Sequence, residues 1–393
     1  LKASYSLTAD RGPASNSLAV FQSFTPWRPS TSANESAIIL AALENSELTY
    51  EKKNELNIGV ALGFVDNRIN VEFDWYRRNN FDLIGYTQTM GVGGVTTKLA
   101  NDATMESTGC EFTISTTNIK TKDFKWTTDW IFGWAENTIT KLDSRSQVYS
   151  LVNGVGRTEG RPIGALYSIP FAGLTEEGLP TFFIDAEHTQ VVGPGNYAAI
   201  YFQEYEDIDY LKYEGTIDPK ITGSFGNTFS WKGLKLNVFF TYSFGNVLRL
   251  DNLCPVYSSD YSDLTASMKE MKNRWMVPGD ENVTTIPSIP TVRQMREIDA
   301  LNNAYSAYNY STERVAKGDF IRLKELSLAY DLPKKYFEGQ NAVSSFGVKL
   351  SATNLWLAYA DKKLNGRDPE YYNTGGVSSP VPRQFTLTVK LGF

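Results

Sequence analysis

The chain has 393 residues, of which 21% are charged and 13% aromatic, and its formal net charge is −6. This acidic balance and the lack of a basic cluster argue against a nucleic-acid partner, which basic patches would have to hold. The longest apolar run, Ala37–Leu43, falls far short of the roughly 18 residues of a transmembrane helix. Any membrane crossing therefore has to use strands.

Alternation of apolar and polar residues predicts β-strands along most of the chain. The first strand, Leu1–Asp10, has no charged n-region, apolar h-region or cleavage site, so we expect the protein's N-terminus to lie elsewhere. We predict ten strands, plus an ambiguous pair around Ile163–Ala186. The clearest later runs are Leu56–Phe64, Ile69–Tyr76, Phe124–Ala135, Leu234–Gly245 and Phe385–Phe393.

The length of these runs separates two fold classes. Most reach the about 9–11 residues of a membrane-crossing strand, whereas strands of soluble proteins average about 5–6 residues. The mean hydropathy is only −0.31 despite the many aromatics. Such a composition arises when one side of each strand meets lipid and the other meets water. On composition alone, a soluble β-sandwich rich in surface tyrosine remains an alternative.

Short and long connections alternate along the chain. The short ones are predicted at Asp66-Asn67, Lys120–Asp123, Lys232-Gly233 and Leu332–Ser344. The long ones are Ala9–Lys53, Gly85–Thr104, Asp143–Asp218, Leu250–Lys317 and Tyr359–Val381. Transmembrane barrels have short periplasmic turns and long extracellular loops. We therefore predict an all-β fold, an antiparallel transmembrane β-barrel wall whose long loops are extracellular.

Several stretches, in order, resemble the SusC/RagA family of TonB-dependent outer-membrane transporters. They lie at residues 48–63, 107–115, 159–180 and 273–282, followed by "GDFIRLKELSLAYDLP" at 318–333, "SATNLWLAY" at 351–359, "GRDPEYY" at 366–372 and "PVPRQFTLTVKLGF" at 380–393. The "FIRLK" strand is similar to the family's signature strand. The resemblance covers nearly the whole chain.

The resemblance implies that residues 1–393 form the C-terminal part of a barrel of about 22 strands. The plug domain and N-terminal strands would lie outside this chain, and Leu1–Thr8 should not pair with Phe385–Phe393. The implied function is TonB-dependent nutrient import across the outer membrane of a Gram-negative, Bacteroidetes-like cell. Oligosaccharides or oligopeptides would be the substrates, a SusD-like lipoprotein and TonB the partners, and outer-membrane lipid the surroundings. A passive porin and a soluble carbohydrate-binding β-protein are the alternatives.

No catalytic, metal or cofactor site is expected. His188 has too few donors nearby for a metal site, and "YEDIDYLKYEGTIDP" at 205–219 lacks the ligand spacing of a calcium loop. The glycine-rich stretch at 91–94 lacks the Lys-Ser/Thr of a phosphate loop. A disulfide between Cys110 and Cys254 is not expected. The two cysteines lie far apart in the sequence and show no metal-ligand spacing.

Aromatic residues of the predicted loops are the candidate substrate-binding groups, because aromatic faces beside polar groups suit sugars and peptides. They are Tyr201, Tyr205, Trp275, Tyr305, Tyr308 and Tyr310. The last three lie in "NNAYSAYNY", and Trp275 lies at the end of a short helix predicted at Ser262–Trp275. The competing interpretation is that they pack the loops together. By the resemblance, the terminal Phe393 acts as a barrel-assembly signal.

Overall fold

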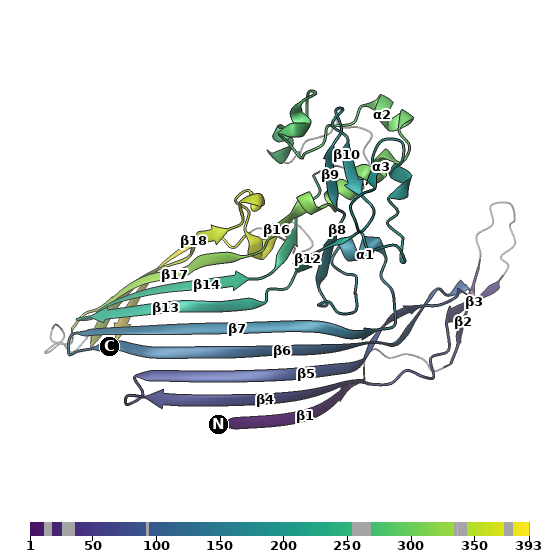
Figure 1. Ribbon diagram of the computed structural model, residues 1–393. Coiled ribbons are helices and arrows are strands. Elements are labelled where there is room, and N and C mark those ends of the chain that lie inside the picture. Colours follow the sequence, from purple (N-terminus) through teal and green to yellow (C-terminus); the bar gives the residue numbers. More distant parts are fainter. Residues whose placement is uncertain are drawn as a thin grey trace.

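The computed structural model describes residues 1–11, 18–25, 36–91, 94–253, 269–333, 336, 344–372 and 380–392. Its main feature is a ten-stranded antiparallel sheet in the order β1-β4-β5-β6-β7-β13-β14-β17-β18-β19 (Figure 1). The strands are β1 (Lys2–Asp10), β4 (Glu51–Phe64), β5 (Ile69–Gln88), β6 (Thr97–Lys120), β7 (Phe124–Leu142), β13 (Ile221–Trp231), β14 (Leu234–Phe244), β17 (Phe320–Asp331), β18 (Ser345–Ala360) and β19 (Gln384–Gly392). The predicted strand number is confirmed. Among the described residues, no helix is long and apolar enough to cross a membrane.

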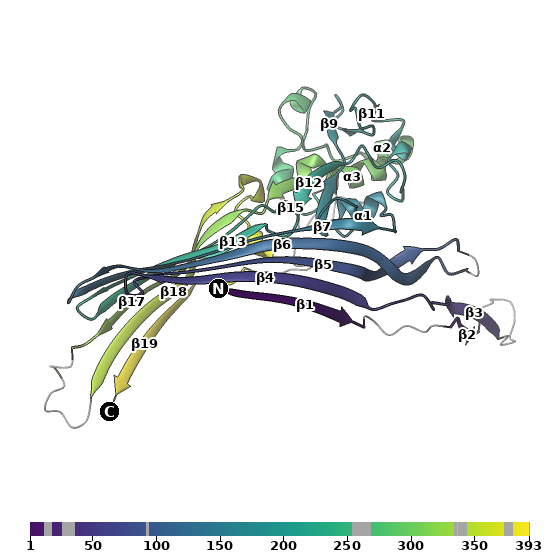
Figure 2. The same ribbon diagram turned by 60° about the horizontal axis from the view of Figure 1, so that its bottom comes forward.

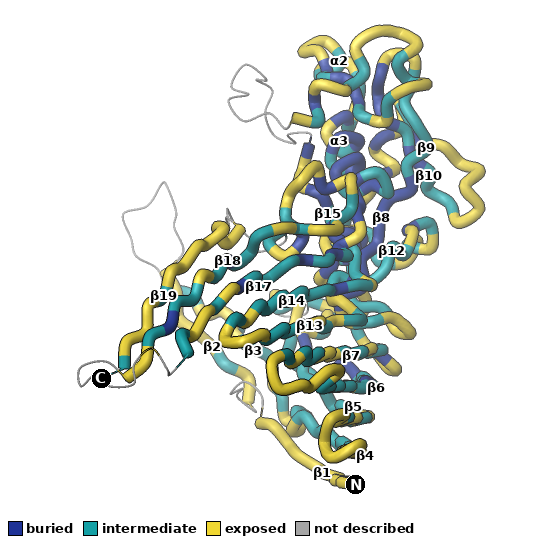
Figure 3. Tube along the Cα trace, turned by 90° about the vertical axis from the view of Figure 1, so that its left-hand side faces the viewer, coloured by how far each residue is buried: buried dark blue, intermediate teal, exposed yellow. Residues whose placement is uncertain are grey.

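The sheet has two edges. Within the described residues, β1 pairs only with β4 and β19 only with β18, and the two edge strands do not pair with each other. The prediction that the first and last strands do not pair with each other is therefore confirmed for residues 2–10 and 384–392. The sheet is curved when viewed along its strands (Figure 3).

Tight turns lie at one end of the sheet and long connections at the other. The turn between β4 and β5 has three residues with left-handed backbones, Val65, Asp66 and Asn67. The turn between β13 and β14 uses Lys232 and Gly233 at φ 45° and 92°. Positive φ at both central positions matches the twist of a two-residue hairpin. The predicted turns at these places are confirmed, whereas most of the connection at 332–344 lies outside the described residues.

One predicted loop is wrong. Residues Gly85–Thr104 were expected to be a long connection, but β5 continues to Gln88 and β6 begins at Thr97, with those two residues paired. The stretch is polar because this hairpin extends well beyond the about 9–11 residues needed to cross a bilayer. Antiparallel backbone hydrogen bonds hold it there without alternating apolar side chains.

The register brings residues of like polarity together on each face. One row across the strands contains Val71, Ile114, Trp130, Phe225 and Phe240. The neighbouring row on the other face contains Glu72, Thr113, Ser224 and Thr241, with Ile131 of β7 as its one apolar member over these strands. On the apolar face, Leu350 and Leu387 face each other and are 52% and 67% exposed. A face of exposed large apolar side chains of this extent needs an apolar environment, as at the lipid face of a membrane barrel.

The long connections contain short elements of their own. A hairpin is formed by β2 (Val20–Phe24) and β3 (Ala37–Ala42). Others are α1 (Val148–Val152), β8 (Ala165–Ser168), β9 (Phe171–Leu174), β10 (Pro180–Phe183), β11 (Val191–Val192), β12 (Lys212–Thr216), β15 (Val247–Arg249), α2 (Val292–Glu297), α3 (Leu301–Asn309) and β16 (Val315–Lys317). The ambiguous pair around Ile163–Ala186 therefore corresponds to β8, β9 and β10, which lie outside the main sheet. Of the helix predicted at Ser262–Trp275, the described part holds a 3-10 helix at Lys269–Asn273.

Candidate functional site

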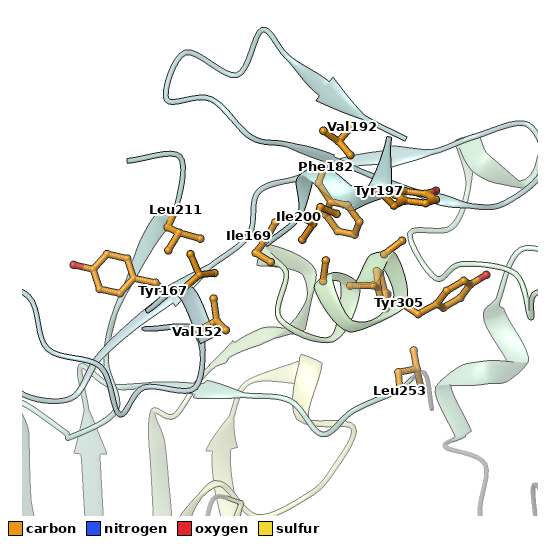
Figure 4. Packing of buried hydrophobic residues seen from close by; sticks show 14 of the residues in the cluster. Val152, Tyr167, Ile169, Phe182, Val192, Tyr197, Ile200, Leu211, Leu253 and Tyr305 are labelled. Atoms are coloured by element: carbon orange, nitrogen blue, oxygen red, sulfur yellow. The ribbon is translucent and has the colours of Figure 1, made fainter. Parts of the chain in front are cut away.

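Two of the long connections fold together at the loop end of the sheet (Figure 2). We call residues 143–220, 246–253 and 269–318 the outer loop cluster. Its core contains α1, α3 and the short strands β8 to β11, and the side chains there include Ile169, Phe182, Tyr197 and Ile200. Figure 4 shows how closely these residues pack. The cluster is therefore a folded unit with its own buried core.

Two candidate binding tyrosines lie in this core. Tyr305 and Tyr308 of α3 are 3% and 1% exposed. The Tyr305 hydroxyl donates a hydrogen bond to the carbonyl oxygen of Ser288 at 2.7 Å. The ring of Tyr308 meets that of Phe171 edge-on, with 5.7 Å between ring centroids. Their position favours packing over substrate contact, the second of the two interpretations of these residues.

Tyr310 is half-buried beside a cation. Its ring meets those of Tyr149 and Phe202 edge-on, and the Arg249 guanidinium lies 5.9 Å from its centroid. Arg249 donates to the carbonyl oxygens of residues 152, 167 and 311 at 3.2, 2.5 and 2.9 Å. Burial lowers the pKa of Arg249 to about 10. This arginine joins three separate segments of the cluster, so Tyr310 too has a structural setting.

Trp275 is also held by packing. Its indole N–H donates to Glu281 Oε2 at 3.1 Å. Its ring covers Gly178 so closely that a Cβ there would lie 2.4 Å from a ring atom. The terminal Phe393 lies outside the described residues.

Tyr205 lines a cleft of about 700 Å³ between the tip of the β5–β6 hairpin and the outer loop cluster. Its hydroxyl accepts a hydrogen bond from Gln147 Nε2 at 2.5 Å. The Glu204 carboxylate accepts from the backbone N–H groups of Tyr205 and Glu206, at 2.8 and 2.9 Å. Hydrogen bonds from these N–H groups lower the pKa of Glu204. The loop that presents Tyr205 is thus fixed by its own carboxylate.

The hairpin side of the cleft supplies two groups that sequence reasoning missed. Tyr86 is 72% exposed and Asp102 only 1%. Asp102 Oδ2 accepts from the Ser144 hydroxyl at 2.7 Å, while Oδ1 has no hydrogen-bond partner among the described residues. A buried acceptor without a partner is costly, and here it lines a cleft. Both residues fall in the segment wrongly predicted to be a loop, and no spacing singled them out.

Tyr201, 55% exposed, lines a separate hollow of about 400 Å³. Asp185, Asp207 and Asp209 share it, together with Tyr210, whose pKa burial and the Glu204 charge raise to about 12. The structure therefore divides the six predicted aromatics. Tyr201 and Tyr205 line hollows, whereas the other four pack within the outer loop cluster.

A scan against protein-family models finds no match. The chain is 27% identical over 391 residues to TonB-dependent receptor P3 of Formosa agariphila, covering 91% of this chain and 35% of that receptor. A stretch of 99 residues is 34% identical to TonB-dependent receptor SusC of Bacteroides thetaiotaomicron, covering 25% of this chain and 10% of SusC. The chain thus spans little more than a third of the curated relatives that it matches along its length.

Among solved structures, the RagAB peptide transporter matches 99% of this chain and 40% of its own chain. The TM-score is 0.71 and the sequence identity 22%. The fold of this chain is therefore the fold of a barrel-type outer-membrane transporter.

Proposed function

We propose that this chain, which is SusC/RagA-like and similar to TonB-dependent receptors over nine tenths of its length, forms the wall and outer mouth of an active nutrient importer in the outer membrane. The similarity to TonB-dependent receptors carries the proposal. The structure supports it with an apolar face suited to lipid, a polar face suited to a lumen, and long loops gathered at one end. The named relatives are receptors and transporters, in keeping with transport rather than catalysis.

The domain arrangement belongs to the same proposal. Within the part of the chain that the structure describes, the edges β1 and β19 carry unpaired backbone groups, each of which costs several kcal/mol in lipid. Further barrel strands, closing at about 22 around a plug, would pair them. The plug and the TonB-contacting segment would lie outside residues 1–393. A SusD-like lipoprotein would cover the outer mouth.

The cleft beside Tyr205 is the proposed place of first substrate contact. It combines an exposed ring at Tyr86, the buried Asp102 carboxylate, whose Oδ1 has no hydrogen-bond partner among the described residues, and several hydroxyls. Oligosaccharides and oligopeptides both present apolar ridges beside hydrogen-bonding edges, which fit such a lining. Tyr201, which is exposed and lines the separate hollow of about 400 Å³, is the second candidate for substrate contact.

Uptake in cells tests the function. The complete protein is produced in an outer membrane, and uptake of a panel of labelled oligosaccharides and oligopeptides is measured with and without TonB. We expect uptake of at least one class, abolished without TonB. TonB-independent uptake would favour the passive porin, and release by salt rather than detergent would favour a soluble β-protein.

A matched pair of variants tests the cleft. Tyr86→Ala removes a ring that is 72% exposed, and Tyr50→Ala removes one that is 58% exposed and not part of the cleft lining. Stacking on an aromatic contributes about 0.5–1.5 kcal/mol, so Tyr86→Ala should raise the half-saturation concentration about two- to tenfold. Equal effects of the two variants would remove the cleft from the proposal.

A further inference from the structure

A hollow of about 550 Å³ lies on the polar side of the sheet, where β17, β18 and the segment after β18 meet. Three stretches singled out in the sequence contribute to it. Arg322 comes from "FIRLK", Asp368 from "GRDPE" and Arg383 from "PVPR". They are far apart in the chain, and the fold places them around one space. The proposed transport function uses none of them.

Arg322 forms the buried floor of this hollow. It is 6% exposed and pairs in register with Thr241, which places it on the polar face of the sheet. Its guanidinium lies 2.5 Å from Asp368 Oδ1 and 3.2 Å from Glu370 Oε2. Its Nε has no hydrogen-bond partner among the described residues. Arg322 is thus a buried guanidinium whose charge two carboxylates neutralise, and it forms a fixed wall of the hollow.

The strand beside Arg322 is distorted at the hollow. The register of β17 and β18 shifts between Leu323 and Glu325, and Asn354 of β18 has a left-handed backbone at φ 52°. Bulges of this kind re-aim side chains and often lie beside functional sites, and asparagine is one of the few residues besides glycine that adopts a left-handed backbone readily. Asn354 and Leu355 both line the hollow. The distortion shapes the wall where Arg322 lies.

The charges of the hollow are unequally satisfied. Among the described residues, the carboxylates here are engaged, Asp368 and Glu370 by Arg322 and Asp251 by Arg367. Arg383 is exposed and has no ion pair among the described residues. The hollow therefore offers an incoming solute a cation and no free anion. Guanidinium groups bind carboxylates through two parallel hydrogen bonds.

We propose that this hollow recognises a carboxylate of the imported solute, with Arg383 as the binding cation and the Arg322–Asp368 pair as the fixed wall behind it. The inference rests on the proposed transport function and narrows its substrates to acidic ones. The carboxylate has two chemical sources. One is the acid group of a uronic-acid oligosaccharide, and the other is the C-terminus of an oligopeptide.

Calorimetric titration of the complete detergent-solubilised protein tests the site. The probes are tetragalacturonate against neutral maltotetraose, and tetra-alanine against its C-terminal amide. We expect the acid member of at least one pair to bind more tightly. Arg383→Gln should weaken that binding about tenfold or more, the size of one lost charge-assisted hydrogen bond. Arg383→Lys keeps the charge and should retain part of the affinity.

Lys390→Gln is the matched control. Lys390 lies on β19, seven residues beyond Arg383, and faces Gly347 in register on the polar side. Like Arg383→Gln, the Lys390→Gln variant removes one positive charge from the polar side of the sheet, but at a position that does not line the hollow. Each protein is first checked for a heat-modifiable barrel, so that folding and binding are separated.

The outcomes separate the two proposals. Loss of acid binding in Arg383→Gln but not in Lys390→Gln supports the site, and the responding pair identifies the source. Equal losses, or no preference for either acid probe in the unaltered protein, would overturn it. If acid binding holds while uptake is independent of TonB, the site stands and the active-import function fails.

Discussion

The buried tyrosine of α3 makes the sharpest prediction about the outer loop cluster. Tyr308 is 1% exposed and meets Phe171 edge-on. Truncating a buried aromatic to alanine costs about 3–5 kcal/mol, which includes the cavity that remains. Because each 1.4 kcal/mol is a factor of ten, Tyr308→Ala should raise the open population of the cluster by about 100-fold or more.

Amide hydrogen exchange measures that population directly. In Tyr308→Ala, amides of α3 and of β8 should exchange about 100-fold faster, whereas amides of β6 and β7 should not change. Tyr308→Phe keeps the ring, and its amides of α3 and β8 should exchange more slowly than those of Tyr308→Ala. Tyr201→Ala, at a site 55% exposed, should stay within about 0.5 kcal/mol of it.

This comparison also separates packing from substrate binding among the predicted aromatics. Slow exchange of α3 in Tyr308→Ala would refute the packing account. Faster exchange in Tyr201→Ala would show that exposure in the structure does not report on packing. If both behave as expected, reduced uptake in Tyr308→Ala reflects an opened cluster, and only exposed aromatics remain for direct contact.

Three further changes test the turns, the cleft and the last strand. Gly233→Ala should lower the amount of folded barrel more than Gly279→Ala does, because both have left-handed backbones but only the first would meet a backbone oxygen, at 2.5 Å; equal band intensities on a heat-modifiability gel would contradict this. The lowered pKa of Glu204 means that its ionised form is favoured by the fold, so its stabilisation of the Tyr205 loop is present above the ordinary pKa of 4.5 and is lost as pH falls through the lowered value. Exchange at the Tyr205 amide, corrected for intrinsic rates, should accelerate there, and Glu204→Gln should remove that pH dependence. Deleting Leu391–Phe393 from the complete protein should sharply lower its folded level in the outer membrane, and an unchanged level would exclude an assembly role.

The wall was predictable because its physics is local. Each strand alternates with a period of two, so a run such as Phe124–Ala135 assigns its own two faces without reference to its neighbours. The structure pairs Trp126 with Phe229 and Trp130 with Phe225, keeping apolar residues on one side. Turn residues then fix which strands are adjacent. A pattern of this kind needs no knowledge of distant contacts.

The outer loop cluster was not predictable because its contacts are distant. Ile169 bridges Ser311, and Arg249 binds carbonyls from three segments. No period in the sequence joins these positions. Asp102 was missed for the same reason. Its burial depends on a contact with Ser144, which is 42 residues away in the sequence.

The outer loop cluster and the wall have separate sources of stability. The buried core of the cluster contains no residue from the ten strands of the main sheet. At the boundary the two parts are joined by hydrogen bonds, such as Ile139 N–H to the Arg161 carbonyl at 2.9 Å, and by a small apolar group around Leu248 and Leu364. The wall depends instead on its register and on lipid against its apolar face. A change in the core of the cluster should therefore alter substrate capture without altering barrel assembly, and a change at a turn should do the opposite.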